Sequence, residues 1–378
     1  MSLHERYRLT RVINAAGSYT PLGVSRSAAP VASAAAEALS EFFVIDELQR
    51  AASDAIARAT GAESAAVTHC AAAAITLSVA ATMTGADPDA IARLPDASGL
   101  PRRVVMPAGH AVDYGHPIVQ DVRLAGATPV PVGGDGPEPI CELDALSAEL
   151  AQQATACLLL VSSRLVRGRS PELTDAVAAA HRHGVPAIID GAAQDLRIGE
   201  LLATGADLVL VSAQKYLAAP TAGLAIGRQS LVDAVRAQEK GIGRSMKATK
   251  EALVGVLAAL DERQRLDLAA WRHAQHDKVA RFVARANALP GVVASITPDP
   301  AGMPFPRAEL QIDPQRAGRD AAAVAAALAA GTPSIRVMTH ALHESKLVLE
   351  LVPLTGGEVG QVLARLSQIV AGSDGLIC

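Results

Sequence analysis

Two charged side chains stand where apolar stretches of the sequence end. The run Leu208–Val211 is followed closely by Lys215, and the run over residues 185–189 ends at Asp190. Burying an ammonium costs several kcal/mol unless a partner or chemistry offsets that cost. In an open α/β sheet both residues would lie at the carboxyl edge, where ligands bind. A lysine and an aspartate at that edge suit pyridoxal phosphate, with Lys215 holding the aldehyde as a Schiff base and Asp190 keeping the pyridine nitrogen protonated.

The pair Ser212 and Lys215, three residues apart, allows two interpretations. In a cofactor enzyme, the Ser212 hydroxyl helps to hold the phosphate. In a penicillin-recognising acyl enzyme, the serine is the nucleophile and the lysine its base. That second class also needs Ser-Asp-Asn and Lys-Thr-Gly elements, which the chain lacks, and its serine opens a helix, whereas Ser212 closes an apparent strand. The sequence therefore favours the cofactor.

Small residues and histidines follow other predicted strands. Cys70 and Ala71 begin a helix rich in alanine, where a phosphate could approach free backbone N–H groups with the favourable end of the helix dipole. A helix packed tightly on the sheet explains this segment equally well. His110 and Tyr114 follow the strand over 104–106 and could lie flat on a pyridine ring, although an ordinary loop histidine is the alternative for His110.

Two basic groups could bind anions. Arg244, Lys247 and Lys250 cluster at the start of a predicted helix, where cations are unfavourable with the dipole, so either an anion partner or surface solubility explains them. Arg336 lies in an apolar strand and could clamp a substrate carboxylate bidentately. A structural ion pair is the alternative for Arg336.

Other site classes lack parts of their motifs. The segment Gly241-Ile-Gly243 lacks the third glycine of a dinucleotide site and sits between predicted helices. The histidine pairs, for example His181 with His183, have no cysteine or carboxylate cluster to complete a metal site. The sequence therefore predicts neither a nicotinamide cofactor nor a metal.

The composition describes an acidic, apolar-rich chain. Of its 378 residues, 50% are hydrophobic and 2% aromatic, the net charge is −4 and the pI is near 6.2, which argues against a nucleic-acid or anionic-membrane partner. The cysteines (Cys70, Cys141, Cys157 and Cys378) have no regular spacing, and the N-terminus has no apolar targeting signal. The stretch from Ala65 to Met83 is too polar for a membrane span. We expect a cytoplasmic protein.

The order of elements predicts an α/β fold. Strands alternate with helices from about residue 61 to 227, which indicates βαβ units and a mostly parallel sheet. The last strand, at 222–227, follows Lys215 after a short connection, which allows it to run antiparallel. A long helix over about 248–287 leads into a smaller α/β part. We predict a large domain with an N-terminal arm at 1–250 and a smaller C-terminal domain at 251–378.

Several segments carry a resemblance to a known family. They are Arg11-Val-Ile-Asn-Ala-Ala-Gly with Thr20 and Gly23, Ala-Val-Thr-His-Cys-Ala-Ala-Ala-Ala, Gly109-His110 with Asp113-Tyr114-Gly115, Ile-Ile-Asp190-Gly-Ala-Ala, Ser212-Ala-Gln-Lys215 and Gly-Arg244-Ser-Met-Lys247-Ala-Thr-Lys250-Glu. Together they resemble the fold-type I pyridoxal-phosphate superfamily, in the branch that holds bacterial selenocysteine synthase and D-glucosaminate-6-phosphate ammonia lyase. The second domain is similar in outline alone.

The resemblance implies roles for single residues. Lys215 would be the Schiff-base lysine, Asp190 the pyridinium partner and His110 the ring-stacking residue. Cys70, Ala71 and Ser212 would surround the phosphate, with Gln214 beside the cofactor. Separately from the resemblance, we predict that Arg336, Arg244 and Thr20 contact the substrate. The chain departs from the family in having Cys70 for the usual phosphate-turn glycine and Ala213-Gln214 for the usual Gly-Gly. The resemblance also implies a homodimer or higher oligomer.

The expected activity is that of a pyridoxal-phosphate-dependent lyase. A 2-amino-3-hydroxy acid, such as an amino sugar acid or its phosphate, would lose its Cα proton to Lys215 and its Cβ hydroxyl, giving a 2-keto acid and ammonia. Racemisation, retro-aldol cleavage, a selenium transferase-like reaction and a non-catalytic cofactor-binding protein remain alternatives. A chain without a basic N-terminal region fits the ammonia-lyase side better than a protein that binds transfer RNA.

Overall fold

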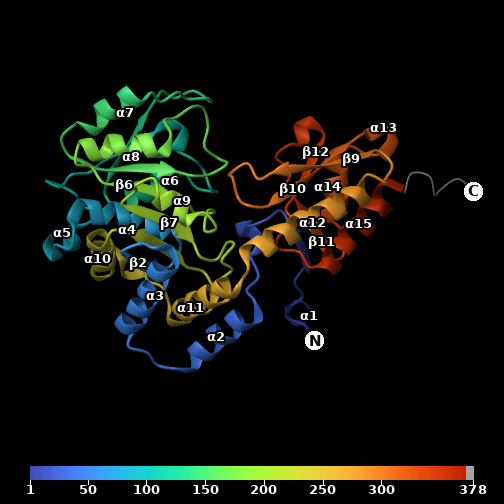
Figure 1. Ribbon diagram of the computed structural model, residues 1–378, viewed down its shortest axis with the longest axis horizontal. Coiled ribbons are helices and arrows are strands. Elements are labelled where there is room, and N and C mark those ends of the chain that lie inside the picture. The colour runs from blue at the N-terminus through green and yellow to red at the C-terminus, as the bar shows by residue number, and fades with distance from the viewer. Residues whose placement is uncertain (372–378) are drawn as a thin grey trace, which may run out of the picture. The chain divides into compact units, whose positions relative to one another are not determined.

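The apolar runs between residues 64 and 227 form one seven-stranded sheet with the order β2-β8-β7-β6-β5-β3-β4 (Figure 1). The computed structural model describes residues 1–371, so Cys378 lies outside the described part. The strands are β2 (Ser64–Thr68), β3 (Arg103–Pro107), β4 (Thr128–Val132), β5 (Thr155–Val161), β6 (Ala187–Asp190), β7 (Leu208–Ser212) and β8 (Gly223–Gly227).

Every pairing from β4 across to β7 is parallel, and β8 pairs antiparallel with both β7 and β2. The prediction of a mostly parallel sheet with a reversed strand after Lys215 is therefore confirmed. Because a short connection joins β7 to β8, the chain has no room for a crossover helix there.

Helices cover both faces of this sheet (Figure 1). Alternate side chains of one strand point to opposite faces: Leu158 and Leu160 belong to one apolar cluster, and Leu159 and Val161 to the other. The first cluster is completed by residues of α2 (Ala29–Ser40), α3 (Ile45–Thr60), α7 (Leu143–Leu150), α8 (Leu173–Arg182), α9 (Ile198–Leu202) and α11 (Lys250–Arg265). The second is completed by residues of α4 (Ala71–Thr84), α6 (Ile118–Leu124) and α10 (Gln229–Ala237).

The helix α4 is buried along nearly its whole length. It packs against strands of the sheet and against α6 and α10, so its alanines and threonines let the elements approach closely. Among residues 1–371, no helix is both long and apolar enough to cross a membrane. Short helices connect the larger elements: α5 (Pro88–Arg93), η2 (Ala108–His110), η3 (Gln238–Lys240) and η4 (Ile242–Ser245).

A second compact unit combines the start of the chain with its C-terminal part. Its bounds are Met1–Arg26 and Leu266–Cys378, and the sheet unit spans Ser27–Arg265; we call them unit 1 and unit 2. In unit 1, β9 (Val292–Pro298), β10 (Pro306–Ile312) and β12 (Lys346–Leu349) form an antiparallel sheet, and β1 (Val12–Ala15) pairs parallel with β11 (Ser334–Val337). Its helices are α1 (Leu3–Tyr7), η1 (Thr20–Leu22), α12 (Leu268–Ala286), α13 (Pro314–Ala317), α14 (Ala321–Ala329), η5 (Leu342–Glu344) and α15 (Gly356–Ala371).

The division into units falls at other residues than the predicted 250/251. Pairing of β1 with β11 places residues 1–26 with the C-terminal part, which the local pattern could not indicate because that pairing spans more than 300 residues. The prediction of a single helix over 248–287 is wrong, because the chain forms two helices there, α11 and α12. Asp267 caps α12 by accepting hydrogen bonds from the N–H groups of Ala269 and Ala270, so the new helix begins where unit 1 resumes.

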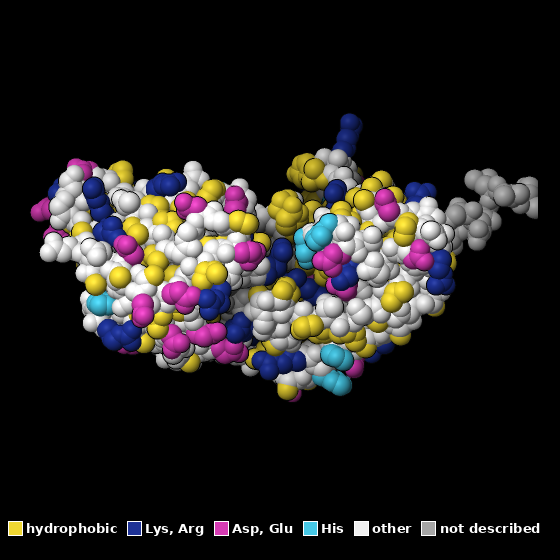
Figure 2. All heavy atoms as spheres, turned by 90° about the horizontal axis from the view of Figure 1, so that it is seen from above, with side chains coloured by type: hydrophobic (Ala, Val, Ile, Leu, Met, Phe, Trp, Pro, Cys, Tyr) yellow, Lys and Arg dark blue, Asp and Glu magenta, His cyan; other side chains and the backbone are white. Residues whose placement is uncertain are grey.

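The visible face of unit 2 carries a mixed surface. Figure 2 shows acidic and basic side chains interspersed there with hydrophobic ones, in keeping with the small net charge of −4. This face therefore has no extended electrostatic potential of one sign.

Candidate active site

The register of the sheet brings the predicted cofactor residues to one edge of unit 2. Thr68 at the end of β2 lies opposite Gly223 of β8, and Gly223 lies opposite Ser212 at the end of β7. Asp190 ends β6, where it pairs with Val161 at the end of β5. Residues from five strands thus share the edge where the parallel strands end.

Asp190 is fully buried and is held through both carboxylate oxygens. Its Oδ1 accepts the N–H of Ala192 at 3.0 Å, and its Oδ2 accepts the hydroxyl of Tyr114 at 2.7 Å. Burial raises the pKa of this carboxyl, while the Tyr114 hydrogen bond and the nearby Lys215 ammonium act in the opposite direction. Burial and the Asp190 charge raise the pKa of the Tyr114 phenol, so Tyr114 stays a donor at neutral pH.

His110 is buried, with an exposed fraction of 3%, and is fixed by the backbone of β5. Its Nδ1 accepts the N–H of Val161 at 2.8 Å, which leaves the proton of the neutral ring on Nε2. Burial lowers the pKa of His110 to about 4, so the imidazole is neutral at physiological pH. A neutral, oriented ring beside the end of β5 has the properties needed to face a pyridine ring.

Lys215 lies in the turn after β7, where its N–H donates to the carbonyl of Ser212 at 3.2 Å. Its surroundings lower the pKa of the ammonium through loss of solvent, and the carboxylates of Asp190 and Asp195 partly oppose this. A lysine with a lowered pKa is more often a free amine, which is the form that attacks a carbonyl or accepts a proton.

Arg263 of α11 fastens the turn that carries Lys215. One of its Nη atoms donates to the carbonyl of Tyr216 at 2.7 Å and to the carboxylate of Asp195 at 3.3 Å. Asp195 in turn accepts the N–H of Tyr216 at 3.3 Å. The residue next to Lys215 is thus held by an ion pair between the buried Asp195 and the partly buried Arg263. This ion pair was not predictable from the local pattern, because Arg263 follows Tyr216 by 47 residues.

The helix start predicted to hold phosphate lies beside Gly223. Cys70 is the N-cap of α4, with its Sγ 3.5 Å from the N–H of Ala73, and Ala71 is the first helical residue. A Cβ on Gly223 would lie 2.2 Å from the carbonyl oxygen of Cys70, so the strand passes too close for any side chain. Ser212 is across the ladder, and its hydroxyl has no hydrogen-bond partner among residues 1–371.

These residues fit pyridoxal phosphate. The buried carboxylate of Asp190 keeps lone pairs for a ring N–H, the helix start and Ser212 offer donors for a phosphate, and Lys215 offers an amine. Two observations support this fit. One is the set of hydrogen-bonding groups just described, and the other is the close passage of Gly223 beside Cys70 at the start of α4, which leaves no room for a Cβ.

The remaining predicted residues divide between the two units. The Gln214 amide oxygen accepts the Thr221 hydroxyl at 2.8 Å, within the turn between β7 and β8. Arg244 is exposed on η4, and the carbonyl of Met246 in the following segment accepts the N–H of His69 at 2.8 Å, which brings this basic turn beside the start of α4. Lys250 is engaged elsewhere, because its Nζ donates to the carbonyls of Leu39 and Glu41.

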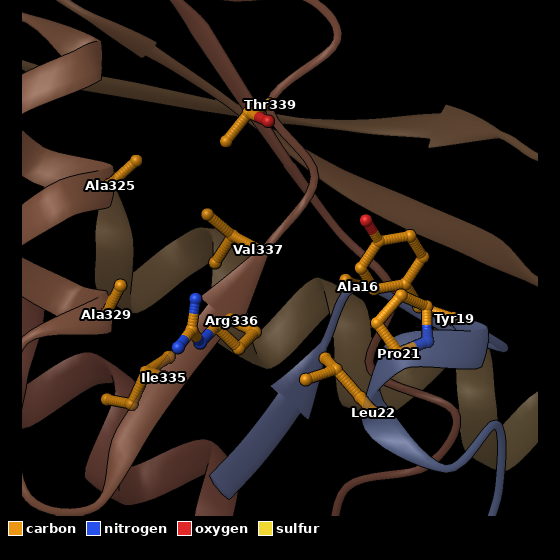
Figure 3. A pocket seen from close by; sticks show the side chains of 10 residues that line it. All are labelled: Ala16, Tyr19, Pro21, Leu22, Ala325, Ala329, Ile335, Arg336, Val337 and Thr339. Atoms are coloured by element: carbon orange, nitrogen blue, oxygen red, sulfur yellow. The ribbon is translucent and has the colours of Figure 1, made fainter. Parts of the chain in front are cut away.

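Thr20 and Arg336 belong to unit 1. Thr20 is exposed in η1, and Arg336 lies on β11 and lines a cavity that Figure 3 shows. Their predicted contacts with the substrate therefore remain predictions.

Tyr114 is the second residue that the sequence offers for ring stacking, and the structure adds a contact that was not predicted. It contacts Asp190 through its hydroxyl. The sequence indicated an aromatic residue near the site but not its partner, because residues 111–117 form an irregular segment whose path no periodicity fixes.

Comparisons with known proteins place the chain among enzymes. No protein-family model matches it. It is 36% identical over 369 residues to D-glucosaminate-6-phosphate ammonia lyase of Salmonella typhimurium (strain 14028s / SGSC 2262), which covers 97% of this chain and 98% of that protein. It is 34% identical over 367 residues to 5'-C-glycyluridine monooxygenase-decarboxylase of a Streptomyces species, covering 96% and 91%.

Solved structures agree on the fold. A structure of D-glucosaminate-6-phosphate ammonia-lyase has a TM-score of 0.89 at 33% identity, covering 98% of this chain and 99% of that one. Aspartate aminotransferase from Thermus thermophilus has a TM-score of 0.58 at 15% identity and coverages of 96% and 99%, a likeness of fold alone. The predicted fold class, an α/β protein of the fold-type I aminotransferase type, is confirmed.

Proposed function

The chain belongs to the fold-type I family of pyridoxal-phosphate-dependent enzymes that contains D-glucosaminate-6-phosphate ammonia lyase, and on this premise we propose that it is an ammonia lyase acting on a 2-amino-3-hydroxy acid. The observation that carries the proposal is similarity over nearly the full length of that lyase, combined with Lys215 and Asp190 at neighbouring strand ends of one sheet.

The names of both relatives support the substrate class. Glucosaminate and a 5'-C-glycyl nucleoside each carry an amino group at Cα and a hydroxyl at Cβ. The two relatives catalyse different reactions, yet their substrates share this 2-amino-3-hydroxy group. We therefore propose the same group for the substrate of this chain. An amino sugar acid that carries a phosphate is the more specific candidate, and only the similarity to the lyase supports it.

We assign roles by the atoms that each residue offers. Asp190 would hold the ring nitrogen of the cofactor, and Tyr114 would keep the Asp190 carboxylate oriented through the hydrogen bond to Oδ2. His110 would lie against the ring. Cys70, Ala71 and Ser212 would receive the phosphate at the start of α4, with Gln214 nearby.

Pyridoxal phosphate, when bound, supplies a protonated pyridine ring that accepts the electron pair left on Cα after proton removal. Lys215 would hold the cofactor in the resting enzyme and would accept the Cα proton on Nζ during turnover. Its lowered pKa suits this task, because desolvation favours the free amine. The Arg263–Asp195 pair would keep the Lys215 turn in place during these steps.

The net reaction needs no oxidant. The substrate loses its Cα proton and its Cβ hydroxyl as water, and one water is added back as ammonia leaves Cα. The product is a 2-keto-3-deoxy acid. Cα is oxidised from an amine to a ketone while Cβ is reduced from an alcohol to a methylene group, so the reaction is redox-neutral overall.

The test is a product assay with a panel of 2-amino-3-hydroxy acids, including D-glucosaminate and its 6-phosphate. We expect equal amounts of ammonia and 2-keto acid, formed without oxygen and lost in Lys215→Ala. Racemised substrate or an aldehyde with no ammonia would instead assign the racemase or aldolase alternatives. No product from any member would contradict the proposal.

A second candidate is an oxygen-dependent decarboxylation, favoured by the 34% identity to the monooxygenase-decarboxylase over 96% of this chain. That reaction would consume oxygen and release carbon dioxide, and it would stop under anaerobic conditions. Oxygen electrode and carbon dioxide measurements on the same panel therefore separate the two candidates without any change to the protein.

We further propose a homo-oligomer in the cytoplasm. Unit 2 exposes an apolar segment between α2 and α3 that we call the 39–45 segment. Its exposed apolar residues are Leu39, Phe42, Phe43, Val44 and Ile45. Two adjacent exposed phenylalanines in a chain with four in all are unusual on a monomer, and a second copy of the chain would cover them.

A further inference from the structure

The irregular segment 111–117, between η2 and α6, carries Tyr114 of the candidate active site. Its backbone folds back on itself. The N–H of Tyr114 donates to the carbonyl of His116 at 3.1 Å, and the N–H of Ile118 donates to the carbonyl of Val112 at 2.9 Å. The position of Tyr114 is therefore tied to that of His116.

The side chain of His116 reaches from this segment to the helix that follows it. Its Nε2 lies 3.1 Å from Oδ1 and 3.0 Å from Oδ2 of Asp121 in α6. An ionised carboxylate only accepts hydrogen bonds, so Nε2 is the donor. The two side chains differ in exposure, with 38% of His116 and 5% of Asp121 accessible to solvent. Asp121 is thus the buried anchor, and His116 is the group that binds to it.

A second helix holds Asp121 in place. Helix α6 packs against α4, where the buried hydroxyl of Thr76 donates to the backbone carbonyl of Asp121 at 3.1 Å. This contact belongs to the core of unit 2, so Asp121 cannot follow a displaced histidine. The hydrogen bond from His116 therefore fixes the segment 111–117 to a rigid part of the fold.

Asp121 also acts on the charge of Asp190. Burial raises the pKa of the Asp190 carboxyl, and the Asp121 charge adds to this increase, whereas the Tyr114 hydroxyl and the Lys215 ammonium oppose it. Burial likewise raises the pKa of the Asp121 carboxyl, and the hydrogen bond from His116 lowers it. A donor on Asp121 offsets part of its charge and so favours the ionised form of Asp190.

We propose that His116 is a positioning residue: its hydrogen bond to Asp121 holds the segment 111–117 so that the Tyr114 hydroxyl stays on Asp190. The inference rests on the proposed function, because the effect is exerted on bound pyridoxal phosphate. His116 acts through Tyr114 and Asp190, so its role requires no contact with the cofactor or the substrate.

The experiment measures the affinity of the full-length chain for pyridoxal phosphate by absorbance titration. We expect His116→Ala to weaken this affinity about 3- to 10-fold, because the segment loses a hydrogen bond to a charged group. The pH dependence of the bound cofactor's absorbance should shift in the same direction as in Tyr114→Phe, since Asp190 loses the same hydroxyl contact. His116→Gln keeps an N–H donor and should retain most of the wild-type affinity.

A double variant shows whether His116 acts through Tyr114. In a Tyr114→Phe background, His116→Ala should change the cofactor affinity less than about 2-fold, because the hydroxyl that it positions is already absent. A merely structural histidine would lower the affinity by the same factor in both backgrounds. The matched control is His273→Ala in α12, whose exposed side chain lies 3.4 Å from the carboxylate of Asp277. It should leave the affinity and the pH dependence unchanged.

Each outcome decides the proposal. A wild type that binds the cofactor, together with equal affinity in His116→Ala or an equal loss in both backgrounds, overturns the role of His116 and leaves the proposed lyase intact. A wild type that binds no cofactor overturns the proposed function and this role with it. If denaturant unfolding shows that His116→Ala does not fold, His116→Phe gives the same comparison, because it keeps a ring and has no donor.

Discussion

At the scale of single residues, the charge of Asp190 depends on its three neighbours. Burial raises the pKa of the carboxyl, and the Tyr114 hydroxyl, the Lys215 ammonium and the Ala192 N–H all favour the ionised form. An ionised Asp190 is what a protonated pyridine nitrogen requires across from it. Tyr114 is therefore a positioning residue, since it acts on the cofactor through Asp190.

The variant Tyr114→Phe keeps the ring and removes the hydroxyl. We expect the affinity for pyridoxal phosphate to fall about 10-fold or more, because a hydrogen bond to a charged group contributes about 1.5–3 kcal/mol. The pH dependence of the bound cofactor's absorbance should also shift, since Asp190 loses a group that lowers its pKa. Tyr7→Phe, at an exposed tyrosine of α1, is the control. Equal cofactor affinity and an unshifted pH profile in Tyr114→Phe would remove Tyr114 from the site.

His110 gives the cofactor-free protein a stability that depends on pH. Its pKa is about 6.5 in an unfolded chain and about 4 when folded, so the unfolded state binds more protons between these values. The free energy of unfolding should therefore fall as pH drops from about 6.5 towards 4. We expect the wild type to lose about 3 kcal/mol more than His110→Asn over this window, measured by denaturant unfolding.

The control for this measurement is His276→Asn, at an exposed position of α12. It should follow the wild type over the same pH range. If His110→Asn also follows the wild type, His110 is not buried as a neutral ring.

The sequence predicted part of this site, for physical reasons. Lys215 and Asp190 were predictable because apolar runs end at a charged residue, which no core strand tolerates without a purpose. The contacts of Tyr114 and Arg263 were not predictable, since both cross between elements and neither residue stands out from its local pattern.

At the scale of elements, the start of α4 depends on the close passage of β8. Gly223 sits between Cys70 and Thr68, and a methyl group there would lie 2.2 Å from the Cys70 carbonyl oxygen and 2.7 Å from Oγ1 of Thr68. Backbone atoms cannot move aside as a flexible side chain would. The strand and the helix start would have to separate.

We therefore expect Gly223→Ala to lower the free energy of unfolding by about 1–3 kcal/mol, as overpacking does, and to weaken cofactor binding as well. Gly136→Ala is the matched control, because a Cβ at that position meets no atom within 4 Å. Denaturant unfolding and titration with pyridoxal phosphate give both readouts. Full stability together with full cofactor affinity in Gly223→Ala would contradict the described packing.

Elements with a local signature were predicted better than long-range pairings. The antiparallel β8 followed from the short connection after Lys215. The break between α11 and α12 was missed because Asp267 reads as one more charged residue of a helix unless its capping role is considered. The pairing of β1 with β11 has no local signal at all.

At the scale of the whole molecule, the 39–45 segment tests the proposed assembly. A charge at Phe42 would be buried against the second copy, so we expect Phe42→Glu to shift the protein to a smaller species in sedimentation velocity. Leu124→Glu, at another exposed apolar residue of unit 2, should leave the assembly unchanged. A wild type that sediments as a monomer at micromolar concentration, or a Phe42→Glu variant that keeps its size, would contradict the proposal.

The proposed function requires that the side chain of Lys215 holds pyridoxal phosphate. The most direct measurement is borohydride reduction of the purified protein after loading with the cofactor, followed by mass mapping of its peptides. We expect one stable pyridoxyl modification, on the peptide that contains Lys215, and its loss in Lys215→Ala. A modification at another lysine, or none in a protein that has been loaded with the cofactor, would contradict it.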